Sequence, residues 1–141
     1  MILNKECDYA FRIIRILQDG KKKTVDVICN EEMIPKSFAY KLLKRLESTG
    51  FLQSFRGRDG GYKLIRNTDS FTMYDVVTLF NKEFIFNECL TKGSVCKRME
   101  EESKSYCKFH IALQDLQMTM ENELKKRSIA EILKHSEEYT I

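Results

Sequence analysis

Residues 34–64 read IPKSFAYKLLKRLESTGFLQSFRGRDGGYKL, and the succession of patterns in this stretch decides the fold. Over residues 36–49, apolar side chains recur at steps of three and four, which predicts a helix with one buried face. Pro35 stands where its fixed φ helps a helix to begin, and Gly50 is placed to end it. The positions predicted to face inward are Phe38, Ala39, Leu42, Leu43 and Leu46.

A β-hairpin is predicted directly after this helix. Residues 51–55 alternate between apolar and polar side chains, as a strand does. Residues 56–61, RGRDGG, are rich in glycine and favour a turn, and residues 62–65 form the returning strand. The hairpin with its two arginines resembles the wing of a DNA-binding domain, because arginines there can pair with phosphates or enter a minor groove.

Two shorter helices are predicted upstream. Residues 8–17 have the helical period and end at Asp19 and Gly20, residues 21–23 form an exposed basic turn, and Thr24 caps a short helix through Cys29. A break is expected over residues 30–33. Two short helices joined by a turn, the second basic and followed by a hairpin, are typical of a winged helix-turn-helix, whose second helix enters the DNA major groove.

The rest of the chain is predicted to be mainly helical. A capped helix is expected over residues 73–81, with Thr72 as N-cap and Asp75 completing a capping box. A long helix is expected over residues 107–127, and a capping box at Ser128 and Glu131 opens a last short helix. The apolar positions of the long helix are Ile111, Leu113, Leu116, Met120 and Leu124. Its exposed apolar stripe favours dimerisation, although intramolecular packing is the alternative.

The predicted fold class is therefore mainly α with a small β-hairpin wing, a winged helix-turn-helix followed by a long C-terminal dimerisation helix. We expect three regions. They are a DNA-binding domain over residues 1–81, a cysteine-containing sensor loop over residues 82–106, and the dimerisation and C-terminal helices over residues 107–141.

The charge is distributed unevenly, which indicates where a polyanion would bind. The net charge is +3, but residues 1–66 hold 14 Lys and Arg against 8 Asp and Glu, while residues 67–141 hold 10 against 13. An ordinary solvated basic surface is the alternative, but the ordered helices and hairpin favour DNA. The predicted DNA-binding residues are Lys36, Ser37, Tyr40, Lys41, Lys44, Arg56, Arg58 and Tyr62.

A second constellation lies downstream, where Cys89, Cys96, Cys107 and His110 have the spacing C-x6-C-x10-C-x2-H. Thiolates and imidazole are ligands suited to an iron–sulfur cluster or to zinc. A thiol redox switch without metal and inert cysteines are the alternatives. The other two cysteines, Cys7 and Cys29, fall within apolar helical patterns and are predicted to be buried structural residues.

Several stretches of the chain resemble the Rrf-type winged-helix transcription regulators, a bacterial family that includes IscR, NsrR and CymR. The most specific stretch is the wing, where LESTGFL, SFRG and GGYKL stand at residues 46–52, 54–57 and 60–64. The other similar stretches are residues 8–12, 34–39 and 71–77. The resemblance implies a homodimer on an imperfect palindrome of double-stranded DNA, with the long helix as the dimer interface.

The resemblance also implies a cofactor. Sensing members of the family hold a [2Fe–2S] or [4Fe–4S] cluster with three cysteines, here Cys89, Cys96 and Cys107. A fourth ligand would be His110 or Asp8 of the partner subunit, with Glu6 nearby. This chain departs from the family in the longer gap between Cys96 and Cys107, which carries the charged insert RMEEE at residues 98–102.

The sequence therefore predicts a cytoplasmic DNA-binding transcription regulator that acts as a repressor. It would sense redox state, nitric oxide or iron–sulfur status through a cysteine-ligated cluster. The alternative is a clusterless winged-helix repressor controlled by a partner protein or by thiol oxidation. A winged helix that has lost DNA binding is disfavoured by the retained cations. A thiol oxidoreductase is disfavoured because no Cys-x-x-Cys motif is present, and no apolar run is long enough to span a membrane.

Overall fold

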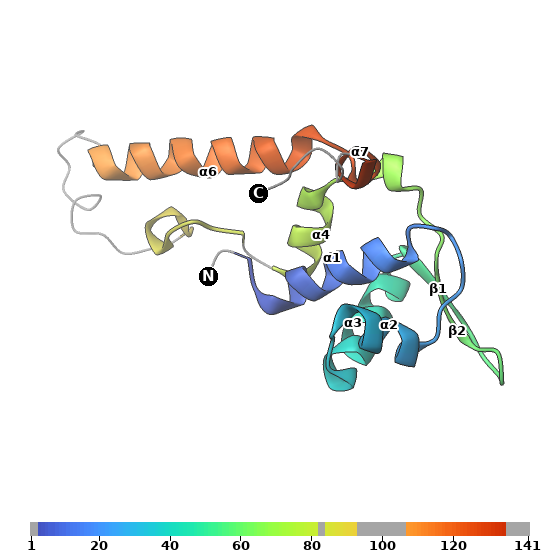
Figure 1. Ribbon diagram of the computed structural model, residues 1–141. Coiled ribbons are helices and arrows are strands. Elements are labelled where there is room, and N and C mark those ends of the chain that lie inside the picture. The colour runs from blue at the N-terminus through green and yellow to red at the C-terminus, as the bar shows by residue number, and fades with distance from the viewer. Residues whose placement is uncertain (1–2, 82–83, 93–106, 135–141) are drawn as a thin grey trace.

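The computed structural model describes residues 3–81, 84–92 and 107–134 (Figure 1). The helices of the first part are α1 (Lys5–Leu17), α2 (Val25–Glu32), α3 (Lys36–Ser48), the 3-10 turn η1 (Thr68–Ser70) and α4 (Met73–Phe80). Between α3 and η1 lie the strands β1 (Leu52–Phe55) and β2 (Gly61–Leu64). The 3-10 turn η2 (Glu88–Leu90), the long helix α6 (Lys108–Lys126) and α7 (Ile129–Lys134) follow. The predicted fold class, mainly helical with one hairpin, is confirmed.

The first two helices are each longer than the sequence predicts. Helix α1 begins at Lys5 because the side-chain oxygen of Asn4 accepts a hydrogen bond from the Cys7 N–H at 2.9 Å and caps the helix. The break expected over residues 30–33 is wrong, since α2 continues to Glu32 and ends at Met33, which is left-handed with φ 53°. The last turn of α2 is held by Arg15, whose guanidinium pairs with the buried Glu32 carboxylate.

Helix α3 runs from Lys36 to Ser48, close to the predicted bounds. Four of the five positions predicted to face inward are buried: Ala39, Leu42, Leu43 and Leu46. Phe38 is the exception and that prediction is wrong, because it is 39% exposed. It lies in the first turn of the helix, where its ring meets the edge of Tyr9 at 5.7 Å between centroids instead of entering the core.

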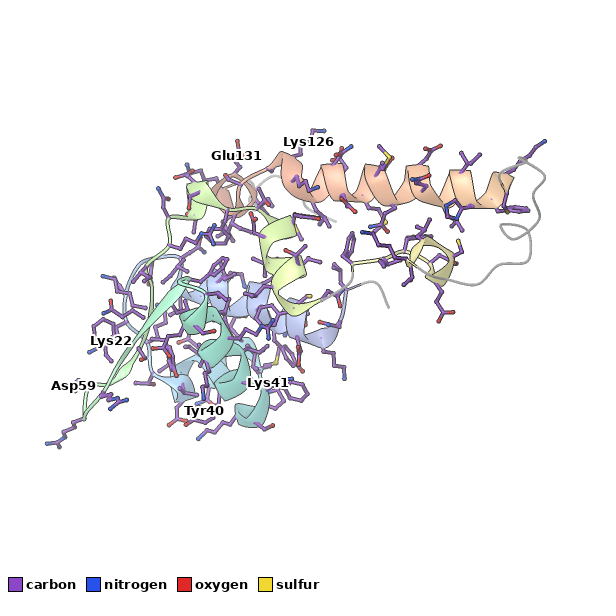
Figure 2. The ribbon with its side chains drawn as sticks, turned by 180° about the vertical axis from the view of Figure 1, so that it is seen from behind. Lys22, Tyr40, Lys41, Asp59, Lys126 and Glu131 are labelled. Atoms are coloured by element: carbon purple, nitrogen blue, oxygen red, sulfur yellow. The ribbon has the colours of Figure 1, made fainter. Side chains whose placement is uncertain are left out.

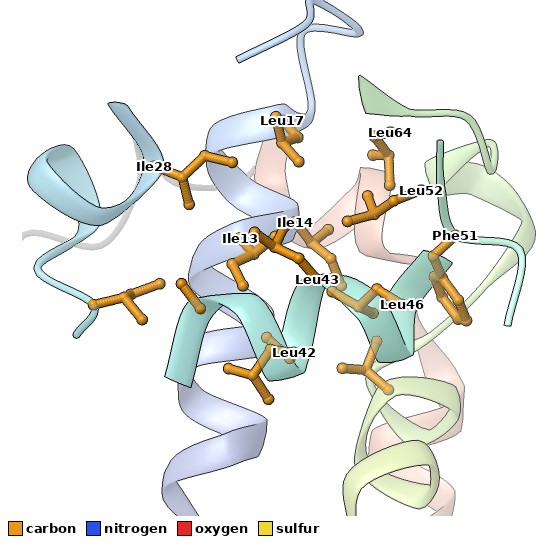
Figure 3. Packing of buried hydrophobic residues seen from close by; sticks show 14 of the residues in the cluster. Ile13, Ile14, Leu17, Ile28, Leu42, Leu43, Leu46, Phe51, Leu52 and Leu64 are labelled. Carbon is orange, nitrogen blue, oxygen red and sulfur yellow. The ribbon is translucent and has the colours of Figure 1, made fainter. Parts of the chain in front are cut away.

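One hydrophobic core joins the first three helices to the hairpin, as Figure 3 shows. Ile13 and Ile14 of α1 point toward Leu43 of α3, Leu17 lies farther along α1, and Leu52 and Leu64 enter from the two strands. All these side chains are less than 10% exposed. Because burying such a side chain stabilises the fold by about 1.5–3 kcal/mol, this core fixes the orientation of α3 relative to the wing.

The hairpin pairs Leu52 with Leu64 and Phe55 with Gly61 in antiparallel register. A third segment joins it. Lys23 and Tyr62 exchange two backbone hydrogen bonds, of 2.9 Å from the Lys23 N–H and 2.8 Å from the Tyr62 N–H. Lys21 and Lys22 are exposed, as the predicted basic turn over residues 21–23 requires, but Lys23 is half-buried and forms a bridge to β2.

The C-terminal helices lie on the side of α4 that faces away from α3 (Figure 1). Helix α4 begins with the predicted capping box, in which the Thr72 N–H donates to the Asp75 carboxylate at 2.8 Å. The predicted capping box at Ser128 and Glu131 also forms and begins α7. An isolated bridge between Thr72 and Ser128 ties the start of α4 to the start of α7.

Helix α6 has two different faces. Leu113, Met120 and Leu124 are half-buried, whereas Ile111 and Leu116, predicted to share their stripe, are 44% and 49% exposed. The side chain of Gln117 binds the connection before η2, since it donates to the Phe84 carbonyl and accepts from the Phe86 N–H, both at 2.7 Å. One face of α6 therefore packs on the rest of the chain and the other is left exposed. Phe109 and Met118, which lie on opposite sides of the helix, are also 80% and 56% exposed.

Candidate nucleic-acid interface and cysteine-bearing segment

The outer face of α3 is turned away from the core. Ser37, Tyr40, Lys41 and Lys44 are all exposed, because the opposite face of the helix carries the buried leucines. Figure 2 shows Tyr40 and Lys41 at the same end of the molecule as the wing, and Lys126 and Glu131 at the other end. The structure thus brings the predicted residues of the helix and those of the wing to one end.

Two of the predicted cations on α3 are already paired with acids. Lys36 Nζ lies 2.6 Å from Asp26 Oδ1, and this carboxylate raises the pKa of Lys36. Lys41 forms a salt bridge with Glu6 of α1. Lys36, Asp26 and Lys41 are exposed to water and Glu6 is half-buried, so neither pair adds much to stability. The positive charge that α3 offers is lower than the sequence suggests.

The tip of the wing carries unpaired cations. Arg56 and Arg58 are exposed, and within the described residues no salt bridge involves either of them or Lys44. The turn closes with a hydrogen bond of 3.0 Å from the Gly60 N–H to the Gly57 carbonyl. A Cβ at Gly60 would lie 2.7 Å from the Phe55 carbonyl oxygen, so the turn depends on glycine there. The wing therefore presents two arginines on a tight backbone.

Tyr62, also predicted to bind DNA, has a second role. Its backbone forms the bridge to Lys23, and its side chain is half-buried against the core. Burial raises the pKa of the Tyr62 phenol, and the nearby Glu47 and Tyr40 raise it further. A neutral phenol beside Tyr40 joins the outer face of α3 to the wing.

The sequence did not single out Lys21 and Lys22. The sequence shows three consecutive lysines, but it contains no pattern that predicts the backbone bridge between Lys23 and Tyr62 on the distant strand β2. In the structure, Lys22 Nζ lies 5.5 Å from the centroid of the Phe55 ring on β1. The turn that bears these lysines therefore lies beside the wing.

The cysteine-bearing segment lies at the other side of the chain. Cys89 sits on η2, Cys107 is the N-cap of α6, and His110 lies in the first turn of α6. Both thiols are half-buried, and η2 packs against α6. Cys96 falls outside the described residues. Three of the four predicted ligands thus occupy two elements that are in contact.

Whether these residues suit a metal or cluster can be tested in two ways. Nδ1 of His110 is buried and has no hydrogen-bond partner among the described residues, so its lone pair is open to a ligand. However, within residues 3–81, 84–92 and 107–134, no three His, Cys, Asp or Glu side chains lie close enough together to hold a metal ion. The donor set fits iron–sulfur chemistry, and Cys96 would have to complete it.

The alternative acidic ligands are occupied within the chain. Asp8 forms a salt bridge of 2.9 Å with Arg12 one turn later on α1. Glu6 pairs with Lys41, as described above. Either carboxylate would have to leave its partner before it could bind a metal held by a second subunit.

The remaining two cysteines are buried, as predicted. Cys7 is 0% and Cys29 is 6% exposed. Burial raises the pKa of both thiols, and the Cys7 thiol contacts the Val77 carbonyl at 3.9 Å. Protonated, buried thiols are unreactive, so these two residues act as small core side chains.

Comparisons with known proteins agree with this architecture. Residues 3–135 match the Rrf2 family, which is described as iron-dependent transcriptional regulators. The chain is 23% identical over 141 residues to an HTH-type transcriptional regulator of Aquifex aeolicus, covering 99% of this chain and 96% of that one. It is 27% identical over 92 residues to the regulator NsrR of Bacillus subtilis, covering 63% of each chain.

The fold is also similar to a solved structure. CymR, the global cysteine regulator of B. subtilis, superimposes with a TM-score of 0.72 at 15% identity, over 95% of this chain and 97% of CymR. These relatives are regulators rather than enzymes, as the sequence predicted. No helix in the described part of the chain is both long and apolar enough to cross a membrane. The match over residues 3–135 places the chain in the Rrf2 family of winged-helix, DNA-binding transcription regulators.

Proposed function

We propose that this regulator binds operator DNA as a homodimer and represses transcription according to the state of an iron–sulfur cluster. The proposal of DNA binding rests on one observation, which is that the exposed cations of α3 and those of the wing lie at the same end of the molecule (Figure 2). Helix α3 would enter the major groove, where Ser37, Tyr40, Lys41 and Lys44 face the bases. Arg56 and Arg58 would bind the phosphates or the minor groove beside it.

The homodimer is supported by the exposed apolar side chains of α6. Phe109, Ile111, Leu116 and Met118 are all more than 40% exposed on a helix that has no fully buried residue. Phe109 with Leu116, and Ile111 with Met118, form two apolar strips on opposite sides of the helix. Exposed apolar strips mark interaction sites, and a symmetric contact between two copies of α6 would cover one of them. The twofold axis would then place two α3 helices about one turn of DNA apart.

The cluster assignment rests on the donor set and on His110. Cys89, Cys96 and Cys107 would bind through thiolates, and His110, with its unpartnered Nδ1, would be the fourth ligand. A bound cluster supplies iron that reacts with oxygen, nitric oxide or reductants. Because Cys89 lies on η2 and Cys107 at the start of α6, these residues would hold the two elements in a fixed relative position when the cluster is bound.

A route from this segment to α3 runs through the first turn of α1. The Asn4 side chain donates to the Phe80 carbonyl at 3.3 Å and to Asn81 at 3.1 Å, at the end of α4 where the connection to η2 begins. Two residues later, Glu6 pairs with Lys41 on α3. A rearrangement of the connection would therefore reach the recognition helix through a single helical turn, and coupling of about 1–3 kcal/mol is typical of such systems.

Anaerobic purification tests the cluster. The wild-type protein is expected to contain iron and sulfide and to absorb visible light, and Cys89→Ala is expected to be colourless. Cys29→Ala is the matched control, because this cysteine is buried in α2 and takes no part in the proposed site. A Cys89→Ala protein that keeps the visible absorbance of the wild type would overturn the assignment.

A clusterless repressor is the second candidate, and one observation favours it. The described residues bring no three metal-binding side chains together. Such a repressor would be free of iron after anaerobic purification and would still bind its operator. Oxidation of Cys89 or Cys107, or a partner protein, would then control its affinity.

A further inference from the structure

We propose that Lys21 and Lys22 form a second phosphate-binding element beside the wing, so that the DNA-binding surface has three cationic parts rather than two. This inference rests on the proposed binding of DNA by α3 and the wing. It concerns a segment that neither the family match nor the recognition-helix pattern assigns a role.

The first step is that the turn has a fixed position. Lys23 is tied to β2 by its two backbone hydrogen bonds with Tyr62, of 2.9 and 2.8 Å. At the other side of the turn, Asp19 accepts from the Lys21 N–H at 2.9 Å and from Lys23 Nζ at 2.7 Å. These contacts lower the pKa of Asp19, the Lys23 side chain most of all. The turn is thus held at both sides, and its lysines project from an ordered backbone.

The second step is the close approach of the turn to the wing. Gly61 has φ +150°, and a Cβ built on it would lie 2.4 Å from the Lys23 carbonyl oxygen. Any other residue would push the two segments apart. The glycine therefore allows the lysine turn to lie directly against the strand that carries the wing.

The third step is the charge. The one acid on the turn, Asp19, is taken by Lys23. Lys21 and Lys22 are exposed, and no salt bridge in the described part of the chain involves them. The Lys22 ammonium lies over the Phe55 ring, which holds the charge beside β1 without neutralising it. Figure 2 shows Lys22 at the same end of the molecule as Asp59 of the wing tip, Tyr40 and Lys41.

These three observations together favour a phosphate backbone as the partner. A duplex that places its major groove on α3 has its phosphates on either side of that groove, within reach of the wing and the turn beside it. Lysine binds phosphate as a point charge, without base specificity. We therefore expect Lys21 and Lys22 to add affinity that is the same for every sequence and that falls with salt.

The experiment measures the affinity of the full-length protein for DNA by fluorescence anisotropy between 50 and 200 mM salt. The probes are a duplex selected from a random pool and an unrelated duplex of equal length. The variant is the double change Lys21→Ala and Lys22→Ala. Its control is Lys126→Ala with Lys134→Ala, which removes the same charge from α6 and α7 at the other end of the molecule. Circular dichroism shows whether each variant is folded.

Two phosphate contacts correspond to about 1.8 units of slope in a plot of log K against log salt. The wild type should therefore lose about tenfold more affinity than the double variant across this salt range. The effect should be equal on both duplexes and absent from the control. An unchanged slope, or an equal change in the control, would overturn the inference while leaving binding by α3 and the wing intact. No salt-dependent binding by the wild type would overturn both proposals.

Discussion

Replacing Gly61 with alanine tests the contact on which the lysine turn depends. The new Cβ would lie 2.4 Å from the oxygen and 2.8 Å from the carbon of the Lys23 carbonyl, and both are backbone atoms that no side-chain rotation can move. The two hydrogen bonds between Lys23 and Tyr62 would lengthen or break as the segments separate. Each such bond contributes about 1 kcal/mol net.

The backbone conformation adds a second cost. Gly61 has φ +150°, and holding an L-residue in such a sparsely populated region costs about 1–3 kcal/mol. The total expected loss in the free energy of unfolding is therefore about 3–5 kcal/mol. Gly20→Ala is the control, because Gly20 also has a positive φ, of +67°, but a Cβ there would meet nothing within 4 Å. Strain alone should cost that variant about 1–2 kcal/mol.

Urea unfolding at one fixed protein concentration measures both variants, and hydrogen exchange at the Tyr62 amide reports the bridge directly. We expect Gly61→Ala to be the less stable of the two by about 2 kcal/mol and to exchange the Tyr62 amide faster. Equal losses in the two variants would show that the turn does not approach the strand as described. The reasoning about Lys21 and Lys22 would then lose its geometric basis.

Three further predictions concern stability and thiol reactivity. Met33→Gly should raise the free energy of unfolding by about 0.5–1 kcal/mol in urea titrations, because Met33 is left-handed with φ 53° and 78% exposed; a loss would contradict this. Arg15→Ala should lower it by about 1–2 kcal/mol by leaving the Glu32 carboxylate buried and unpaired, a value reduced by the exposure of Arg15; no change would refute the role of the pair. In iron-free protein, iodoacetamide should modify Cys107 before Cys7, whose thiol is buried and has a raised pKa. Peptide mass spectrometry measures the order of modification, and earlier modification of Cys7 would contradict the prediction.

Local signals predicted the elements well. Capping residues and apolar periodicity lie close together in the sequence, so Thr72 with Asp75, and Ser128 with Glu131, could be assigned without knowledge of the rest of the fold. The end of α2 could not, because it depends on the contact between Glu32 and Arg15, 17 positions earlier in the chain. Phe38 was misplaced for a similar reason, since periodicity alone does not show that Tyr9 occupies the space beside it.

The candidate site was predicted as a set of residues but not as a charge distribution. Composition shows that Lys36 and Lys41 are basic, but their acidic partners lie on other helices, and pairing across helices follows only from their packing. The contact between the lysine turn and β2 is equally remote from any sequence pattern. The predicted roles of the DNA-binding residues and of Cys89, Cys107 and His110 stay predictions.

The salt bridges of Lys36 with Asp26 and of Lys41 with Glu6 change which parts of the surface contribute affinity for DNA. Exposed pairs of this kind add little to stability, so the main effect of Asp26 and Glu6 is to reduce the attraction of α3 for phosphate. Affinity for the DNA backbone would then come mainly from the cations that form no salt bridge among the described residues, which are Lys21 and Lys22 of the turn, Lys44 of α3, and Arg56 and Arg58 of the wing. Besides Lys44, the outer face of helix α3 carries Ser37 and the 56% exposed Tyr40, which suit hydrogen bonds and apolar contacts with base edges. Phosphate contacts are the same at every site, and only contacts with the bases differ between sequences. A recognition helix that contributes base contacts, while other elements bind the phosphates, therefore discriminates between sequences better than a recognition helix that binds every duplex strongly.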